Sequence, residues 1–208
     1  MTIASYMNLS LRVPLNTTPE QAGRLLQLQV AFAQACNALA PLVQKTRVWN
    51  RVALHHMAYK SLREQFPQMG SQMVCNAIYS VSRHSRMLYQ NPASPFNTAK
   101  LGDKPLPLLK FTDTCPVYFD RHTLSLKDGQ LSMYTLDGRM RFHLALGAED
   151  EAKFHTMKLR EIVLSRVDTG FELSFLFSDG DDEPSAADNN NRADLPEYVM
   201  VEEMNESA

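Results

Sequence analysis

The hydrophobic period of the chain changes twice, and this feature constrains the fold most strongly. Residues 5–13 alternate apolar and polar side chains, which is typical of a half-buried strand. Residues 18–90 carry apolar side chains at helical spacing, and from Leu109 onward the period returns to two. A lone strand needs a hydrogen-bonding partner, so we expect it to pair with strands from the second half of the chain.

Three helices are predicted between the strand regions. The first begins after Thr18, which forms a capping box with Gln21, and is expected to end or kink at Pro41. The second begins near Asn50 and is expected to turn Val52 inward, and Ser71 is expected to cap the third. Residues 91–107 contain four prolines and are predicted to form an irregular linker.

The second half of the chain is predicted to form short antiparallel strands. Hairpin turns are expected at Asp128-Gly129 and Asp137-Gly138, and a last hairpin at residues 161–177. Open sheet edges are costly, and closure into a small barrel removes them. The predicted fold is therefore α+β, an antiparallel β-barrel of the oligonucleotide-binding (OB-like) type with a helical bundle inserted after its first strand. Its parts are the barrel (1–17 and 108–177), the helical insertion (18–90), the linker (91–107) and a disordered acidic tail (178–208).

The net charge of −2 conceals a strong asymmetry. Residues 1–177 hold 20 Lys and Arg against 13 Asp and Glu, whereas residues 178–208 hold ten acidic residues and only Arg192. A basic body favours a polyanionic partner, because Lys and Arg displace the counterions that surround phosphates. The acidic tail either shields that surface or is a solvated end that keeps the protein soluble. Within it, residues 198–201 are predicted to form a short docking strand.

The sequence offers little support for catalysis. Its three cysteines are far apart, the His55-His56 pair lacks the spacing of metal ligands, and no phosphate-binding glycine motif is present. We therefore predict no catalytic residue, metal or cofactor. No signal peptide is evident, and the apolar runs are shorter than the roughly 20 residues of a membrane helix, so a cytoplasmic protein without membrane contact is expected.

Basic and aromatic residues interleave along the second predicted helix and its approach, a combination that suits phosphates and unstacked bases. The basic residues there are Lys45, Arg47, Arg51, Lys60 and Arg63. A similar strip in the predicted barrel consists of Arg121, Arg139, Arg141 and His143. The alternative is an ordinary solvated helix face in which Tyr59 and Tyr79 pack inward.

The third predicted helix carries a polar set made of Gln72, Asn76, Tyr79, Arg83 and Arg86. Gln72 and Asn76 are four residues apart and therefore share one helix face. Their amides are of the type that reads base edges when a helix enters a groove.

Several segments, in order, resemble a known family. L-R-V-P at 11–14 precedes T-P-E-Q at 18–21 and A-C-N at 35–37. Residues 54–67, followed by S-Q at 71–72, are similar to an L-H-x-x-x-Y-x-x-L-R-x-x-F-P and S-Q segment. Residues 118–126 and 131–139 are similar to D-x-R-x-L-x-L and L-S-L-x-T-x-x-G-R hairpins. Together, over residues 5–177, they resemble the N-terminal region of TnpB proteins, transposon-encoded RNA-guided nucleases related to type V CRISPR effectors.

The resemblance implies a wedge barrel that grips the guide RNA scaffold, with inserted recognition helices that contact the guide–target duplex and a short motif beside the target. It assigns RNA binding to the basic residues of the second helix, its approach and the barrel, and DNA binding to the polar set of the third helix. In TnpB, the last wedge strand leads into a RuvC-like nuclease, but only 31 residues follow Phe177 here. The acidic residues among them are not expected to form the rigid cluster that holds metal ions for cleavage.

The expected function is that of a nuclease-deficient RNA-binding protein that acts as a guide-RNA-dependent DNA-recognition subunit. Its partners would be guide or scaffold RNA, target DNA, and either a separate RuvC-bearing nuclease subunit or a second copy of the chain. Two alternatives stay open. In the first alternative, the chain is a protein-interaction subunit or inhibitor that docks on an RNA-guided nuclease complex. In the second, it is the non-catalytic half of a split TnpB-like nuclease.

Overall fold

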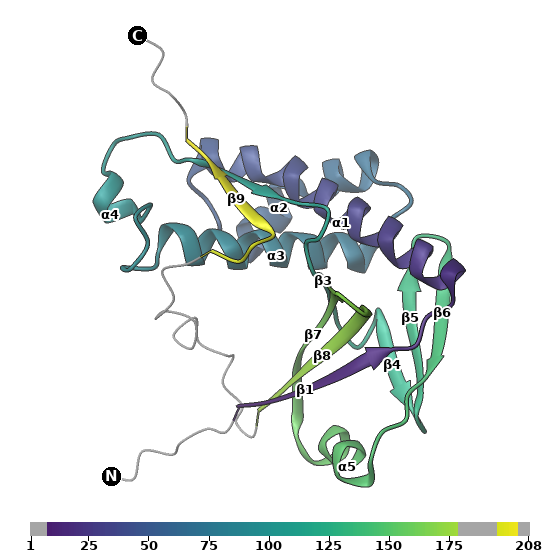
Figure 1. Ribbon diagram of the computed structural model, residues 1–208. Coiled ribbons are helices and arrows are strands. Elements are labelled where there is room, and N and C mark those ends of the chain that lie inside the picture. The colour runs from purple at the N-terminus through teal and green to yellow at the C-terminus, as the bar shows by residue number, and fades with distance from the viewer. Residues whose placement is uncertain (1–7, 179–194, 204–208) are drawn as a thin grey trace, which may run out of the picture.

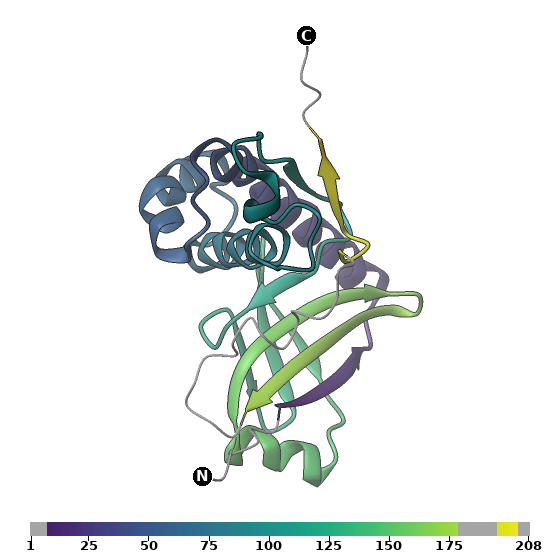
Figure 2. The same cartoon turned by 90° about the vertical axis from the view of Figure 1, so that its left-hand side faces the viewer.

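A computed structural model describes residues 8–178 and 195–203 of the protein, which has an α+β fold. In the described residues, five helices accompany three antiparallel sheets of four, two and three strands. Figures 1 and 2 show the long helices α1, α2 and α3 as one layer, with most of the strands beneath it. The α+β class was predicted correctly.

Helix α1 (Pro19–Thr46) begins as the capping box predicts. Thr18 Oγ1 accepts from the backbone N–H of Gln21 at 3.2 Å, and Gln21 Oε1 accepts from the Thr18 N–H at 3.0 Å. The helix does not end at Pro41 but continues to Thr46. Buried residues on both sides of the proline, including Ala40 and Val43, hold this last part of the helix against the core and offset the hydrogen bond that proline cannot make.

Helix α1 is also the main core helix. By length and composition it could cross a membrane, with a mean hydropathy of 1.2, but 56% of its most apolar 18-residue window is buried inside the fold. Leu25, Leu28 and Phe32 are fully buried. Its apolar surface is therefore covered largely by the protein itself.

Helix α2 (Arg51–Gln65) begins where Asn50 accepts from the N–H groups of Val52 and Ala53, as predicted. It buries Leu54, Ala58 and Leu62, whereas Val52, which was expected to point inward, is 63% exposed. The expectation for Val52 was wrong because the buried face of α2 consists of Leu54, Ala58 and Leu62, and a residue two positions before Leu54 lies on the opposite side of the helix.

Helix α3 (Ser71–Tyr89) has Gly70 rather than Ser71 at its cap position, and no side chain caps it. Residues 91–107, which were predicted to form an irregular linker, contain a short helix α4 (Thr98–Leu101) and three buried polar residues, Asn91, Ser94 and Asn97. Local side-chain hydrogen bonds to backbone N–H groups, such as Asn97 to Ala99 and Ser94 to Phe96, hold these turns.

The four-stranded sheet combines a strand from the start of residues 8–178 with strands from the end of that range. Its strands are β1 (Asn8–Leu15), β8 (Gly170–Ser178), β7 (Lys158–Val167) and β3 (Val117–Phe119), in that order. Leu9 pairs with Phe177 and Leu15 with Phe171, so the predicted pairing of the first strand with a late strand is confirmed. Helix α5 (Ala148–Thr156) covers one end, where the Phe154 ring lies 5.0 Å from that of Phe175.

The three-stranded sheet is a meander of β4 (Leu124–Lys127), β5 (Gln130–Thr135) and β6 (Gly138–His143). Both predicted turns are present. Asp128 and Gly129 adopt φ values of 50° and 71°, which suit a tight hairpin, and Gly138 has a φ of 109°. The Asp-Gly dipeptides therefore located the first hairpin turn correctly and the second to within one residue, since its two turn residues are Leu136 and Asp137 and Gly138 begins β6.

The described strands do not close into a barrel, so the prediction of an OB-like barrel was wrong. Strand β3 is only three residues long, and the chain turns away after it. Asp120 Oδ1 holds this turn by accepting from the N–H groups of His122 and Thr123, each at 3.0 Å. Strand β4 starts beyond the turn and joins a different sheet. The outer strand β1 carries Pro14, which lacks a donor and discourages edge pairing.

The two-stranded sheet consists of β2 (Leu108–Phe111) and β9 (Val199–Glu202). Residues 108–111 were assigned to the barrel, but they pack on α1, where the Asn37 amide exchanges two 2.8 Å hydrogen bonds with the Phe111 backbone. Strand β9 is the predicted docking strand, and Figure 2 shows it beside the helical layer. The rest of the predicted acidic tail, residues 179–194 and 204–208, lies outside the described residues.

Candidate nucleic-acid interface

The three-stranded sheet has one buried and one open face. Leu131, Met133, Met140 and Phe142 point into the core. The alternate residues form what we call the outer face, which consists of Ser125, Lys127, Gln130, Ser132, Tyr134, Arg139, Arg141 and His143. All are exposed except Ser132, which is half-buried. The predicted strip of Arg139, Arg141 and His143 therefore lies on one face of β6.

The register arranges the outer face in three rows across the strands. Tyr134 is opposite Arg139 in the first row. The second row runs from Ser125 through Ser132 to Arg141, and the third from Lys127 through Gln130 to His143. Strands β4, β5 and β6 contain no Asp or Glu. The outer face thus presents three permanent positive charges and no carboxylate.

The Arg139 guanidinium lies over the ring of Tyr134. The guanidinium carbon lies 4.2 Å from the centre of the Tyr134 ring, within the range of a cation–π contact. Nη1 donates to the Ser132 hydroxyl at 3.1 Å and to its carbonyl at 3.3 Å, and Nη2 donates to the His122 carbonyl at 3.4 Å. Both side chains remain exposed, and Tyr134 retains 42% of its accessible surface.

Three carboxylates border the outer face in its turns, those of Asp120, Asp128 and Asp137. Asp137 is paired with Arg24 of α1, whose Nη2 lies 2.8 Å from Oδ1. Hydrogen bonds from Thr135 and Arg24 lower the pKa of the Asp137 carboxyl. The Asp120 carboxylate accepts hydrogen bonds from backbone N–H groups of its own turn and from the Gln72 amide. Two of the three bordering negative charges therefore already have partners within the protein.

Arg121 is exposed in the turn between β3 and β4, next to His122, whose carbonyl Arg139 contacts. This places Arg121 at the border of the outer face. Sequence reasoning missed Lys127 and Tyr134, although the alternation along β4 and β5 and the position of the Asp-Gly turns contain the signal needed to place them opposite the predicted residues.

The predicted basic residues of α2 form a different surface. Arg51 and Lys60 are exposed, and the Arg51 guanidinium lies 5.4 Å from the centre of the Tyr79 ring. The rings of His55 and Tyr59 stack at 4.6 Å. Arg63 is half-buried and donates to the Met69 carbonyl, so it holds the turn between α2 and α3.

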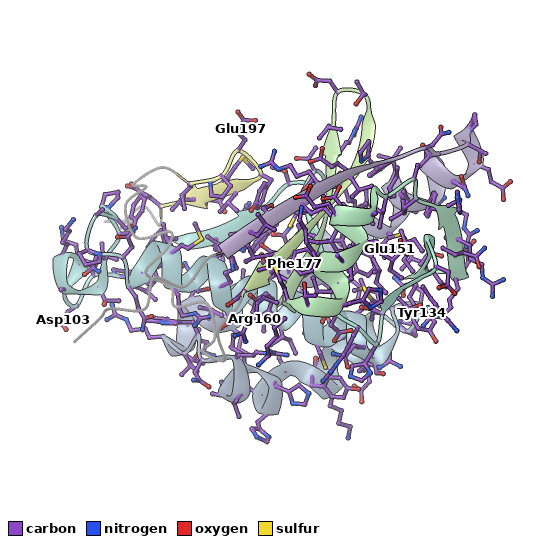
Figure 3. All side chains as sticks on the ribbon, turned by 90° about the horizontal axis from the view of Figure 1, so that it is seen from below. Asp103, Tyr134, Glu151, Arg160, Phe177 and Glu197 are labelled. Carbon is purple, nitrogen blue, oxygen red and sulfur yellow. The ribbon has the colours of Figure 1, made fainter. Side chains whose placement is uncertain are left out.

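Lys45 and Arg47 lie at the end of α1, beside a hollow of about 360 Å³ that Asp103 also lines. Arg47 donates to the carbonyls of Gly102 at 3.1 Å and Lys104 at 2.5 Å, which ties the helix end to the following loop. Figure 3 shows Asp103 and Tyr134 on opposite sides of the molecule, so this hollow is far from the outer face. The nine predicted RNA-binding residues do not form one continuous surface.

The amides of α3 are not arranged as the base-reading prediction requires. Asn76 is only 5% exposed, and its Nδ2 donates to the Tyr118 carbonyl at 3.0 Å and to Thr123 Oγ1 at 3.5 Å. Gln72 Nε2 donates to Asp120 Oδ2 at 2.5 Å. Both amides join α3 to the β3–β4 turn, because α3 packs against the strands as well as against α1 and α2.

Two further residues of the predicted polar set, Tyr79 and Arg83, face the four-stranded sheet. Tyr79 donates to Glu161 Oε2 of β7 at 2.8 Å, and Arg83 Nη1 lies 2.9 Å from the same oxygen. Burial, followed by the Glu161 charge, raises the pKa of Tyr79. Arg86 is half-buried. Tyr79 and Arg83 are therefore committed to an internal contact, and the predicted DNA-binding set does not form an open helix face.

Within the described ranges, no group of three or more His, Cys, Asp and Glu side chains is placed to hold a metal ion. The three cysteines carry free thiols, two of them buried. A scan against protein-family models gives no match, and a search of the curated proteins gives none either. The outer face of the three-stranded sheet is therefore the best candidate for a functional surface on structural grounds.

Proposed function

We propose that the protein binds RNA through the outer face and acts as a nuclease-deficient, guide-RNA-dependent DNA-recognition subunit. One observation carries the RNA-binding part: Lys127, Arg139, Arg141 and an exposed tyrosine share a face on which the strands place no carboxylate. Cations neutralise phosphates, aromatic rings stack on bases, and sheet faces of this composition are common RNA-binding surfaces.

The guided role rests on the resemblance to the TnpB wedge and recognition region. In such a complex, pairing with the guide reads the sequence while the protein reads duplex shape and a short adjacent motif. Recognition by such a protein does not require cleavage. The exposed Arg51 and Lys60 of α2 are candidates for backbone contacts with target DNA or with a second part of the RNA.

The first experiment is to purify the full chain at low salt, sequence any RNA that remains bound, and measure its affinity at several salt concentrations. Arg141→Ala is expected to weaken binding and to reduce the slope of log K against log salt by about 0.7 for each lost phosphate contact with single-stranded RNA. Arg166→Ala is the matched control, because Arg166 is an exposed arginine on β7, outside the outer face. A preparation without RNA, or equal effects of both substitutions, would contradict the proposal.

A second candidate is docking on another protein, either as a subunit or inhibitor of an RNA-guided nuclease or as half of a split nuclease. The observation in its favour is strand β9, which pairs with β2 alone among the described strands and leaves Met200 53% exposed. An unpaired strand edge is a common place for a partner strand to add. Substituting Asp181 and Asp182 by asparagine separates this candidate from RNA binding.

A further inference from the structure

The first row of the outer face is more specialised than a general phosphate-binding surface. Tyr134 and Arg139 present a phenol ring and a guanidinium that are already in contact, with 4.2 Å between the guanidinium carbon and the ring centre. We propose that an unpaired base stacks on this pair, so that the outer face selects single-stranded RNA over duplex RNA. This inference rests on the RNA-binding function proposed above and names its substrate class.

The Arg139 side chain is ordered before any ligand arrives. Its three hydrogen bonds, to the Ser132 hydroxyl, the Ser132 carbonyl and the His122 carbonyl, fix the guanidinium plane over the ring. A flexible arginine would lose rotamer entropy when it stacked on a base, whereas this one has already lost it on folding. The pair is therefore preorganised for stacking.

The neighbouring row leaves room for a base. Ser125 and Ser132 are the two shortest side chains on the outer face, and they lie beside the first row. Alternate residues on one face of a strand are about 7 Å apart along it. The Arg139 guanidinium occupies the space beside Ser132, so a planar base would lie above the exposed Ser125 and against the guanidinium. Arg141 ends this row, and Lys127 lies in the next, where both can meet phosphates on either side of the stacked nucleotide.

The same geometry disfavours a duplex. In an RNA duplex the base faces are covered by their neighbours, and proteins contact it through its backbone and shape. The Tyr134–Arg139 pair then contributes nothing beyond charge. Stacking is also tolerant of sequence, because every base has a π face, so the selection concerns strandedness more than base identity.

The test uses a labelled ten-nucleotide RNA without self-complementarity, free or annealed to its complement, and the full chain. We expect the free strand to bind at least about tenfold more tightly than the duplex. Tyr134→Ala should weaken binding of the free strand by about 5- to 150-fold, as expected for a stacked base, and leave duplex binding unchanged. Tyr134→Phe, which keeps the ring and removes the hydroxyl, should bind like the wild type. Circular dichroism melting checks that each variant folds.

The outcomes separate this inference from the proposed function. If Arg141→Ala weakens binding but Tyr134→Ala does not, or if the duplex binds as well as the free strand, the face binds RNA without stacking and the inference is overturned. If RNA co-purifies with the protein but the free ten-nucleotide strand does not bind, the inference fails in the same way. If no RNA binds under any condition, the proposed function itself fails.

Discussion

His84 lies inside the fold between the helical layer and the C-terminal strand. Its Nδ1 is 2.8 Å from the Ser80 carbonyl and its Nε2 is 3.1 Å from the Tyr198 hydroxyl. A carbonyl can only accept, so Nδ1 carries the proton and Nε2 accepts from the tyrosine. Burial, with a smaller contribution from the positive charge of Arg83, lowers the pKa of His84 to about 4. The neutral ring is therefore the form that the fold requires.

The low pKa of His84 predicts that the free energy of unfolding decreases in acid. The unfolded chain binds a proton at His84 near pH 6.5, whereas the folded protein resists protonation down to about pH 4. The stabilisation is thus complete above pH 6.5 and is lost as the pH falls from 6.5 to 4, by roughly 3 kcal/mol in total. Urea unfolding at a series of pH values measures it.

The control for this prediction is His84→Gln, which keeps an amide donor and acceptor but cannot titrate. Carboxylates also change charge near pH 4, so the informative quantity is the difference between the two proteins. The free energy of unfolding of the variant is expected to fall less steeply between pH 6.5 and 4. Parallel pH profiles would show that the His84 ring is accessible to protons in the fold.

At the scale of single elements, β9 is attached to the body by alternate side chains. Val199 is buried and Met200 is 53% exposed, as expected for a strand with one covered face. Its ladder to β2 pairs Val199 with Phe111 and Glu202 with Leu108. Tyr198, just before the strand, adds the contact to His84. One short strand therefore depends on very few anchoring groups.

We expect Val199→Asp to release β9, because a carboxylate would lose its hydration in the buried site. Hydrogen exchange at the Thr112 amide, which donates to the Tyr198 carbonyl, should then accelerate by at least about tenfold, while exchange at the Phe111 amide, which donates to Asn37, and within the β7–β8 ladder stays unchanged. Met200→Asp is the matched control, since it places the same charge at the exposed neighbouring position. Similar exchange in both variants would mean that β9 does not protect the Thr112 amide.

At the element scale, the local signals predicted which segments form helices and hairpins. The capping residues Thr18 and Asn50 and the Asp-Gly turns depend on neighbours close in sequence, and the structure contains all of them. The expected end of the first helix at Pro41 is the informative failure, because α1 continues to Thr46. The local preference of Pro41 ends a helix, but burial of Ala40 and Val43 against distant segments outweighs that preference.

At the scale of the whole molecule, charge is divided between a basic body and an acidic C-terminal region. The body has an excess of seven positive charges over residues 1–177. The acids at residues 179–194 connect β8 to β9 in the sequence, and β9 is docked on the body.

We expect Asp181→Asn/Asp182→Asn to raise RNA affinity by about two- to fivefold at low salt, because removing nearby negative charge reduces repulsion of phosphates. The gain should disappear near 0.5 M salt, where such interactions are screened. Glu149→Gln/Asp168→Asn changes the net charge equally at other exposed positions and serves as the control. Loss of a protein partner, with unchanged RNA affinity, would instead favour the docking alternative.

Sequence alone determined the segments with a local signature: the starts of α1 and α2, the two hairpins near the Asp-Gly dipeptides, the alternation that puts Arg139, Arg141 and His143 on one face, and the short strand near the C-terminus. These follow from periodicity and turn chemistry, which involve residues close together in the chain. The pairing of the first strand with a late strand also followed, because an isolated half-buried strand has few possible partners.

Only the tertiary structure decided which surfaces meet. Asn76 has the polarity of a surface residue, but it lies between α3 and the β3–β4 turn, where its amide satisfies the Tyr118 carbonyl. The turn at Asp120 separates two sheets that periodicity alone would join into a barrel. Burial and long-range hydrogen bonds depend on segments far apart in the chain, so the hydrophobic pattern of one segment cannot specify them.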